Sequence, residues 1–463
     1  MNKIKEIDYF LLKDKEFNIL YHIPTGNLIK VSEQIFNELN DNKELKSEET
    51  LELISFLDAQ DCITIRKYNE EKFAIRKRLQ GLVFSAAETC NLKCRYCFAD
   101  GGTYGNNTHK IMNINDYEKY IGILLDKYPE GIESINFFGG EPLLGFNSIK
   151  ECLLYVLDIC KEKNLTLPKF SIITNGTLLT EDMIDFFNKY NVNITLSLDG
   201  PKHINDKARI SKDGTSVYDK VTENLKLMKK RKFKLVLEAT ITKYHMLAYK
   251  KGFVRELIDE FNDFDAILLA PVFTDVPDLT LSEDQKETIK MFYGELVDCW
   301  FEKVTSGEKA FYISEIIGIL NTIIFKRYFN DCGAGECIYI AASGEIYPCQ
   351  AFYGSKTYKL GQLSDNLNFD NFVKLSNEIN KTNRLQVEAC KKCPVRYSCG
   401  AWCRGTNNTV NGSILSIIES RCWCQNAILE AVLKNLVRVQ SNQEISSKFI
   451  QNFNRLIEEN KIQ

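Results

Sequence analysis

Three cysteines, Cys90, Cys94 and Cys97, lie within eight residues, at spacings of four and three. Their thiolates can converge from one loop on one metal centre. A structural zinc site takes four ligands, but His109 is twelve residues further on and Cys152 falls in a helical pattern. A [4Fe-4S] cluster takes one ligand for each iron, so three cysteines leave one iron open to a ligand from outside the chain.

A second group of cysteines gathers toward the end of the chain. The part from Cys390 to Cys403 would by itself also suit a zinc ribbon. The whole array is longer and comprises Cys332, Cys337, Cys349, Cys390, Cys393, Cys399, Cys403, Cys422 and Cys424.

Length and composition limit the class of protein. The 463 residues exceed the usual domain size about threefold, and 44% hydrophobic residues can bury two or three cores. Charges interrupt the first residues, so no signal peptide is expected, and no membrane span is expected either. We therefore expect a cytoplasmic protein, in which clustered cysteines bind metal rather than form disulfides. A net charge of -3 also argues against nucleic acid as a partner.

From about residue 81 to residue 305 the sequence repeats a strand-like run followed by a helical pattern six times. Alternation of this kind predicts parallel strands with right-handed crossovers, in an open barrel or a doubly wound sheet. In either architecture the site lies at the carboxyl ends of the strands. The chain is polar or glycine-bearing there, at Thr89, Gly139 to Pro142, Asn175 and Asp199. The predicted strands are 81–88, 134–140, 170–176, 193–200, 234–242 and 266–273.

The two flanking regions differ from this repeat. Residues 1–75 predict a hairpin around the turn Pro24-Thr25-Gly26, followed by helices over 31–40 and 47–60 that each begin near a serine. Residues 306–463 begin with a linker helix, become irregular and cysteine-rich beyond about residue 330, and end in one amphipathic helix predicted over 425–460. We therefore divide the chain into three domains, 1–75, 76–305 and 306–463.

The motif at Cys90, Cys94 and Cys97, with Tyr96 before the third cysteine, resembles that of the radical S-adenosylmethionine superfamily, and Gly139-Gly140-Glu141-Pro142 resembles its methionine-amino-group motif. The resemblance implies a partial (β/α)6 barrel of the α/β class. It also implies that the open iron is chelated by S-adenosylmethionine, which is cleaved to a hydrogen-abstracting 5'-deoxyadenosyl radical. Glu141 and nearby carbonyls would accept hydrogen bonds from the ammonium of this cofactor. By the same resemblance, Ser197 and Arg209 match the positions that contact its ribose and carboxylate.

The second array resembles the SPASM extension, which binds two auxiliary [4Fe-4S] clusters. The resemblance assigns one cluster to Cys332, Cys337, Cys349 and Cys403. It assigns the other to Cys390, Cys393, Cys399 and a last cysteine, for which spacing favours Cys422 over Cys424. The remaining cysteines, Cys62, Cys152, Cys160, Cys299 and Cys424, are expected to pack in the core.

The sequence says less about the reaction carried out on the substrate. Anaerobic sulfatase-maturating enzymes carry an aspartate base directly after the third SPASM cysteine, where this chain has Gln350. An amide accepts no proton at neutral pH. No catalytic base is assigned, although Glu336, Glu345 and Asp199 are acids near candidate loops.

The residues around both arrays look most similar to maturases of cysteine-rich ribosomal peptides. The amino-terminal module resembles the winged-helix element that binds a precursor's leader by strand addition. We therefore expect a radical S-adenosylmethionine enzyme that forms thioethers in such a precursor, with a reductant such as flavodoxin or ferredoxin. Alternatives are carbon-carbon crosslinking, epimerisation and formylglycine maturation. A non-catalytic electron carrier or zinc scaffold is a further alternative, and it would need no S-adenosylmethionine.

Overall fold

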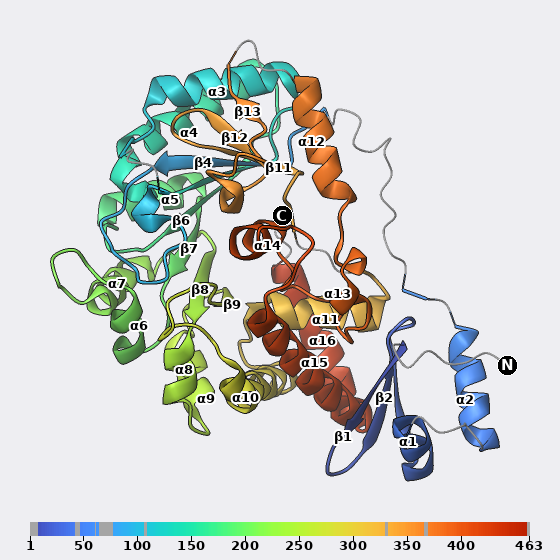
Figure 1. The fold of residues 1–463 in the computed structure, drawn as a ribbon. Coiled ribbons are helices and arrows are strands. Elements are labelled where there is room, and N and C mark those ends of the chain that lie inside the picture. The colour runs from blue at the N-terminus through green and yellow to red at the C-terminus, as the bar shows by residue number, and fades with distance from the viewer. Residues whose placement is uncertain are drawn as a thin grey trace.

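One sheet of ten strands organises the chain (Figure 1). The structure is a computed structural model that describes residues 8–41, 47–60, 62–63, 77–105, 109–328, 332–364 and 369–460. Six neighbouring parallel strands follow one another in chain order, so all six predicted strands are confirmed. Because the strand order is linear and has two edges, the barrel is open, as in the expected partial (β/α)6 fold. The six are β4 (Gly81–Ala87), β5 (Ser134–Gly139), β6 (Lys169–Thr174), β7 (Asn193–Ser197), β8 (Leu235–Ile241) and β9 (Ala266–Pro271).

Helices connect these strands and cover the outer face of the sheet (Figure 1). Polar side chains begin several of them: Asn113 and Thr180, for example, each accept a hydrogen bond from a backbone N–H of the first turn. No described helix is long and apolar enough to cross a membrane. The connecting helices are α3 (Ile114–Lys127), α4 (Phe146–Glu162), α5 (Glu181–Tyr190), α6 (Lys202–Ala208), α7 (Val217–Leu225), α8 (Lys243–Ala248) and α9 (Phe253–Glu260).

The two faces of the barrel strands differ in polarity. Alternate residues such as Ile172, Leu196 and Leu237 are fully buried beneath the helices. The residues between them are only partly buried and include Asn136 and Ser171, whose side chains hydrogen-bond at 2.8 Å. Successive residues of a strand point to opposite faces. The lumen of the barrel is therefore lined by polar side chains that a ligand can reach.

The sheet continues beyond residue 305, where the second domain was expected to end. β10 (Tyr312–Ile313) pairs with β9, and β11 (Cys337–Ile340) pairs in parallel with β4. β12 (Glu345–Tyr347) and β13 (Gly361–Gln362) complete the sheet after β11. The cysteine-rich region and the barrel therefore share one sheet.

The carboxyl-terminal region is mainly helical and differs from prediction at its end. Two helices, α15 (Glu419–Gln440) and α16 (Gln443–Glu459), occupy the range predicted as one. The single helix was wrong because Asn442 accepts hydrogen bonds from the backbone N–H groups of Glu444 and Ile445 and so starts a new helix. The other helices after β9 are α10 (Lys286–Ser306), α11 (Ser314–Phe325), α12 (Phe369–Lys381), α13 (Glu388–Lys391) and α14 (Arg404–Asn411).

The amino-terminal module lies beside α15 and α16 (Figure 1). The predicted hairpin is β2 (Asn18–His22) and β3 (Asn27–Val31), and an unpredicted strand, β1 (Tyr9–Lys13), pairs with β2. Helices α1 (Glu33–Asn40) and α2 (Glu48–Asp58) begin at their expected serine caps, Ser32 and Ser47. Residues 1–7, 42–46, 61 and 64–75 of the expected module lie outside the described residues.

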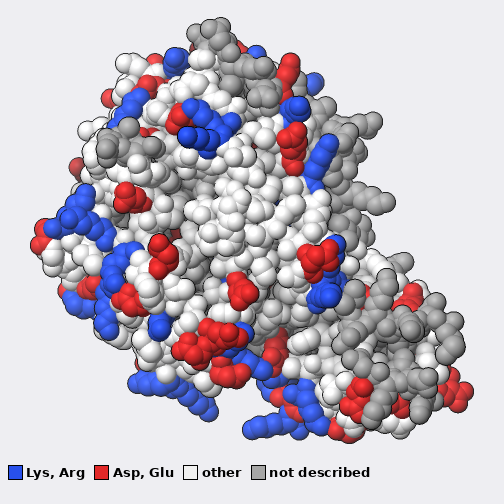
Figure 2. Space-filling view, in the orientation of Figure 1, with Lys and Arg blue, Asp and Glu red and all other residues white. Residues whose placement is uncertain are grey.

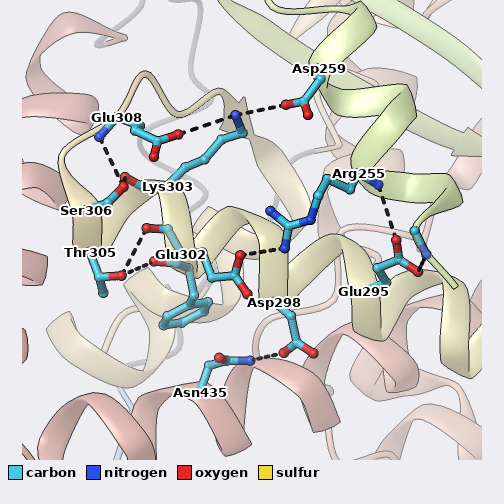
Figure 3. Close-up of polar contacts among 12 residues, drawn as sticks. Arg255, Asp259, Glu295, Asp298, Glu302, Lys303, Thr305, Ser306, Glu308 and Asn435 are labelled. Atoms are coloured by element: carbon cyan, nitrogen blue, oxygen red, sulfur yellow. Dashed lines mark hydrogen bonds and ion pairs between the residues drawn. The ribbon is translucent and has the colours of Figure 1, made fainter.

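Ion pairs and capping bonds join α9 to α10 (Figure 3). Arg255 of α9 pairs with Glu302 at 2.5 Å, and Lys303 pairs with Asp259 at 3.1 Å. Glu295 of α10 accepts hydrogen bonds from the backbone N–H groups of Gly252 and Arg255, both at 3.2 Å. A carboxylate at the start of a helix satisfies backbone donors that have no partner within the helix.

Replacing Glu295 by alanine should lower the free energy of unfolding by about 1 to 2 kcal/mol, because the first turn of α9 loses its acceptor. Urea denaturation followed by circular dichroism measures this change. Glu308→Ala is the matched control, since Glu308 is exposed and its carboxylate pairs loosely with Lys303, at 3.8 Å. Equal stability of Glu295→Ala and wild type would contradict the capping role.

Candidate active site

The Cys90 to Cys97 loop follows β4 and borders a cavity of about 240 Å³. All three thiols line this cavity. The Sγ of Cys90 lies 3.3 Å from the backbone nitrogen of Leu92, and that of Cys97 lies 3.4 Å from the backbone nitrogen of Gly101. Among the described residues, no three histidine, cysteine or acidic side chains could hold a single metal ion. A [4Fe-4S] cluster differs from such a site because each thiolate binds a separate iron.

Burial affects the protonation of Cys90 and Cys94. It raises the pKa of Cys90 to about 11 and that of Cys94 to about 12. A thiolate at these positions therefore needs a positive centre beside it, which bound iron supplies. Three convergent thiols and no fourth ligand suit a cluster with one open iron.

Gly139 and Gly140 bring the backbone close to the same cavity. A Cβ at Gly139, whose φ is 137°, would lie 2.3 Å from the carbonyl oxygen of Ala87, and one at Gly140 would lie 2.3 Å from that of Thr89. Only glycine fits here without moving backbone. Main-chain polar groups therefore approach a ligand closely, as the expected methionine site requires.

Glu141 lies beside the cavity, with its carboxylate bonded to the protein. Its carboxylate is fully buried and accepts hydrogen bonds from the hydroxyl of Thr174 at 2.6 Å and from the backbone N–H groups of Asn175 and Leu143. Burial raises its pKa to about 7, although these bonds oppose the rise. Glu141 is not among the residues that line the cavity. Its carboxylate hydrogen-bonds to the end of β6, and its expected contact with the ammonium of S-adenosylmethionine stays a prediction.

Asp199, after β7, is fully buried and organises the other side of the cavity. One carboxylate oxygen accepts from Arg209 Nη2 at 3.0 Å and from the backbone N–H of Thr240, and the other accepts from the Tyr96 hydroxyl at 2.5 Å. The Arg209 guanidinium also lies 5.5 Å from the Tyr96 ring centre. Both carboxylate oxygens of Asp199, one of the acids noted near the candidate loops, are therefore engaged within the protein.

His245 of α8 holds the backbone of Asp199 through a hydrogen bond. Its Nδ1 accepts from the Thr242 N–H at 3.0 Å, so the proton lies on Nε2, which donates to the Asp199 carbonyl oxygen at 2.6 Å. Burial lowers the pKa of His245 and keeps the ring neutral. The ends of β7 and β8 are therefore joined by polar contacts of Asp199 with Thr240 and His245.

The expected cofactor residues Tyr96, Ser197 and Arg209 line the cavity together with the three cysteines. Arg209 Nε is buried and has no hydrogen-bond partner among the described residues. Asn175 also lines the cavity and lies 3.7 Å from Cys90 Sγ. An unsatisfied guanidinium nitrogen beside the cysteines suits an incoming carboxylate.

The first auxiliary set of cysteines gathers around β11 and β12. Cys332 and Cys403 share a hydrogen bond, and Cys349 lies within electrostatic reach of Cys403 and Cys337. The pKa of Cys349 is raised to about 12, chiefly by burial. These four cysteines come from three segments of the chain and are compatible with one cluster.

Cys422 lies near the other cysteines of the expected second auxiliary set. It interacts electrostatically with Cys390, Cys393 and Cys399, whereas Cys424 faces Tyr293, Arg421 and Glu315. The two differ by more than half a helical turn, so they point to different sides of α15. The preference for Cys422 agrees with this placement.

Replacing Cys422 by serine should therefore lower the iron content of anaerobically reconstituted protein, while Cys424→Ser should retain it. Iron and sulfide analysis per chain measures the difference, and the two variants control for each other. A loss of iron in Cys424→Ser alone would reverse the assignment.

The remaining acids and cysteines lie elsewhere. Glu345 pairs with Lys359 on β12, and neither it nor Glu336 lines the cavity. Cys152, Cys160 and Cys299 are buried as expected, but Cys62 is exposed, so its expected core position was wrong. Gln350, directly after Cys349, does line the cavity, as does Glu238 of β8, which was not anticipated. A lone acid in an alternating apolar strand was the sequence signal for Glu238.

The comparisons with known proteins agree with this site. Residues 85–247 match the Radical SAM superfamily. A cysteine-type anaerobic sulfatase-maturating enzyme of Clostridium perfringens is 28% identical over 379 residues, covering 78% of this chain and 98% of that protein. The radical SAM cyclopropyl synthase TigE of Paramaledivibacter caminithermalis is 23% identical and covers 92% of this chain and 95% of its own.

Solved structures share the architecture. That of anSMEcpe with bound AdoMet has a TM-score of 0.65 and 25% identity, covering 78% of this chain and all of that one. SuiB of Streptococcus suis, bound to S-adenosylmethionine, has a TM-score of 0.52 and 18% identity, covering 90% of this chain and 98% of its own, and shows the same fold.

The chain is thus a radical SAM enzyme of the SPASM type. A radical SAM domain binds S-adenosylmethionine and a [4Fe-4S] cluster, and the later cysteines are compatible with auxiliary clusters.

Proposed function

We propose that this enzyme, in the cytosol, installs thioether crosslinks in a ribosomally made, cysteine-containing precursor peptide. The observation that carries the proposal is that Gln350, next to the auxiliary ligand Cys349, enters the same cavity as Cys90, Cys94 and Cys97. A substrate in this cavity would lie between two cluster sites. Forming a bond after loss of a hydrogen atom releases one electron, which an auxiliary cluster can accept.

Each part of the cavity has a task in this proposal. When bound, S-adenosylmethionine and its cluster supply the hydrogen-atom abstraction, with electrons from a reductant such as flavodoxin or ferredoxin. Gly139 and Gly140 admit the methionine end, and Ser197 and Arg209 hold the ribose and carboxylate. Asp199 orients Arg209 and Tyr96 for this purpose. Apolar residues such as Phe138 and Phe273 limit the access of water.

Formylglycine formation, as the name of the Clostridium relative suggests, is the second candidate. The chain lacks an acid after Cys349, and the amide of Gln350 cannot take the substrate's proton there. Thioether formation therefore has the better support.

Mass spectrometry of reconstituted enzyme with a synthetic cysteine-containing precursor peptide tests the proposal. We expect a product lighter by two hydrogens per bond that no longer reacts with thiol reagents. The same peptide with serine in place of cysteine should be unchanged. A lighter product with free thiols would indicate a carbon-carbon bond, a product that has lost sulfur would indicate formylglycine, and an unchanged mass would contradict crosslinking.

We also propose that the amino-terminal module binds the precursor's leader along the outer edge of β3. Within the described part of the chain, no strand pairs with that edge. Beside it is a hollow of about 500 Å³, lined by apolar residues that include Leu28, Ile29 and Phe56. An extended peptide can add there as a further strand, with its side chains in the hollow.

Phe56→Ser and Leu51→Ser form a matched pair for the leader site. Both side chains are exposed on α2, by 55% and 50%, but only Phe56 lines the hollow. Fluorescence anisotropy with the labelled leader should show binding about tenfold weaker for Phe56→Ser and unchanged for Leu51→Ser. Equal affinities of both variants and wild type would contradict this site.

A further inference from the structure

Glu238 places a carboxyl in the middle of the barrel lumen. On β8, Leu235, Leu237, Ala239 and Ile241 are fully buried, whereas Glu238 lies on the other, lumen-facing side. It is opposite Ser197 of β7 in the strand register and lines the same cavity as the three cysteines. Among the residues that the structure describes, no other acid lines this cavity.

The other buried acids near the strand ends are engaged, whereas Glu238 is not. Glu88 accepts hydrogen bonds from the backbone N–H of Ala342 and from the hydroxyl of Tyr353. The carboxylates of Glu141 and Asp199 accept the hydrogen bonds described above. For the Glu238 carboxyl, the described residues supply no hydrogen bond or ion pair. Its carboxyl group is therefore open to a ligand in the cavity.

The surroundings of Glu238 suit proton transfer. Burial is the largest influence and raises its pKa, Arg209 opposes the rise, and Asp199 adds to it. These two are the charged groups that face Glu238. A carboxylate whose pKa is raised is a stronger base than an ordinary glutamate. The amide of Gln350, in the same cavity, has no such capacity.

We propose that Glu238 is the general base that takes the proton from the substrate cysteine. This inference rests on the thioether function proposed above. The S–H bond of the cysteine breaks, an O–H bond forms on the Glu238 carboxylate, and the sulfur keeps the electron pair as a thiolate. No electron leaves or enters in this step. The proton then passes to solvent through the mouth of the cavity.

Glu238→Gln and Glu238→Asp test the proposal in reconstituted enzyme with the same peptide. Crosslinking by Glu238→Gln should fall about 100-fold or more, because an amide of equal size accepts no proton. In wild type the rate should fall as pH drops below the pKa of Glu238, and Glu238→Gln should lose this limb of the profile. Glu238→Asp should keep the limb at a lower rate. Glu151→Gln, on the exposed face of α4, is the matched control.

Two readouts do not depend on turnover. Infrared difference spectra of wild type against Glu238→Gln should contain a carboxylic-acid band at low pH that disappears as pH rises. Calorimetric affinity for S-adenosylmethionine should be unchanged in Glu238→Gln. Weakened cofactor binding would instead assign the carboxyl to the cofactor and overturn the proposal.

A wild-type rate and pH profile in Glu238→Gln, or loss of the pH limb in Glu238→Asp, would also overturn the proposal. Wild-type enzyme that forms no thioether would contradict the proposed function itself. Wild-type enzyme that forms it, at a rate shared by Glu238→Gln, would contradict only the role of Glu238.

Discussion

Replacing Cys94 by serine should abolish cleavage of S-adenosylmethionine and remove about one third of the iron, since one of three clusters loses a ligand. Cys94 is partly buried, and its charged or titratable neighbours are Cys90, Cys97, Asp199 and Arg209. A serine hydroxyl is a far weaker ligand for iron than a thiolate. Anaerobic reconstitution, iron analysis and chromatography of 5'-deoxyadenosine measure both effects.

Cys62→Ser is the control for Cys94→Ser, because Cys62 is exposed and lies outside every cysteine set. It should keep the iron content and the cleavage rate of wild type. Full iron and normal cleavage in Cys94→Ser would show that the loop after β4 does not hold the open cluster.

Replacing Asp199 by asparagine should lower the free energy of unfolding by about 3 to 5 kcal/mol, as expected when a buried ion pair loses one charge. The guanidinium of Arg209, only 7% exposed, would remain charged without its carboxylate. The Tyr96 hydroxyl would lose its anionic acceptor in the same substitution. Denaturant titration measures the loss, and the affinity for S-adenosylmethionine should fall with it because Arg209 is no longer oriented.

Asp219→Asn is the matched control for this prediction. Asp219 pairs with Lys202 at the surface, where solvent and salt screen the interaction, so little change is expected. Stability of Asp199→Asn equal to that of this control would contradict the organising role of Asp199.

Local patterns predicted much of this fold. The six barrel strands alternate with amphipathic helices, and their polar ends fall at one edge of a parallel sheet, so the site could be placed there. The starts of α1 and α2 could be predicted because each capping serine and the backbone N–H that it binds lie within four residues of each other. The cysteine spacing was enough to favour Cys422 over Cys424.

Contacts between distant segments could not be predicted. The pairing of β11 with β4 joins residues more than 250 positions apart, and no local pattern encodes it. Glu141 carries the expected motif, but its partners Thr174 and Asn175 lie on another strand and turn its carboxylate away from the cavity. The sequence shows Asp199 only as an acid near a candidate loop, and it does not show that Tyr96 and Arg209 hydrogen-bond to its carboxylate. The break between α15 and α16 at Asn442 could have been predicted, since asparagine favours the start of a helix.

The ladder between β11 and β4 has a mechanical consequence. It joins Cys337 to Ile340 with Gly81 to Phe84, directly before the loop that carries Cys90. Swinging the auxiliary region away from the barrel would break these backbone bonds within the central sheet. The two cysteine regions therefore move as one rigid frame, with a constant separation between their metal sites. A path for the proposed peptide substrate must therefore open elsewhere than at a hinge between the barrel and the auxiliary region.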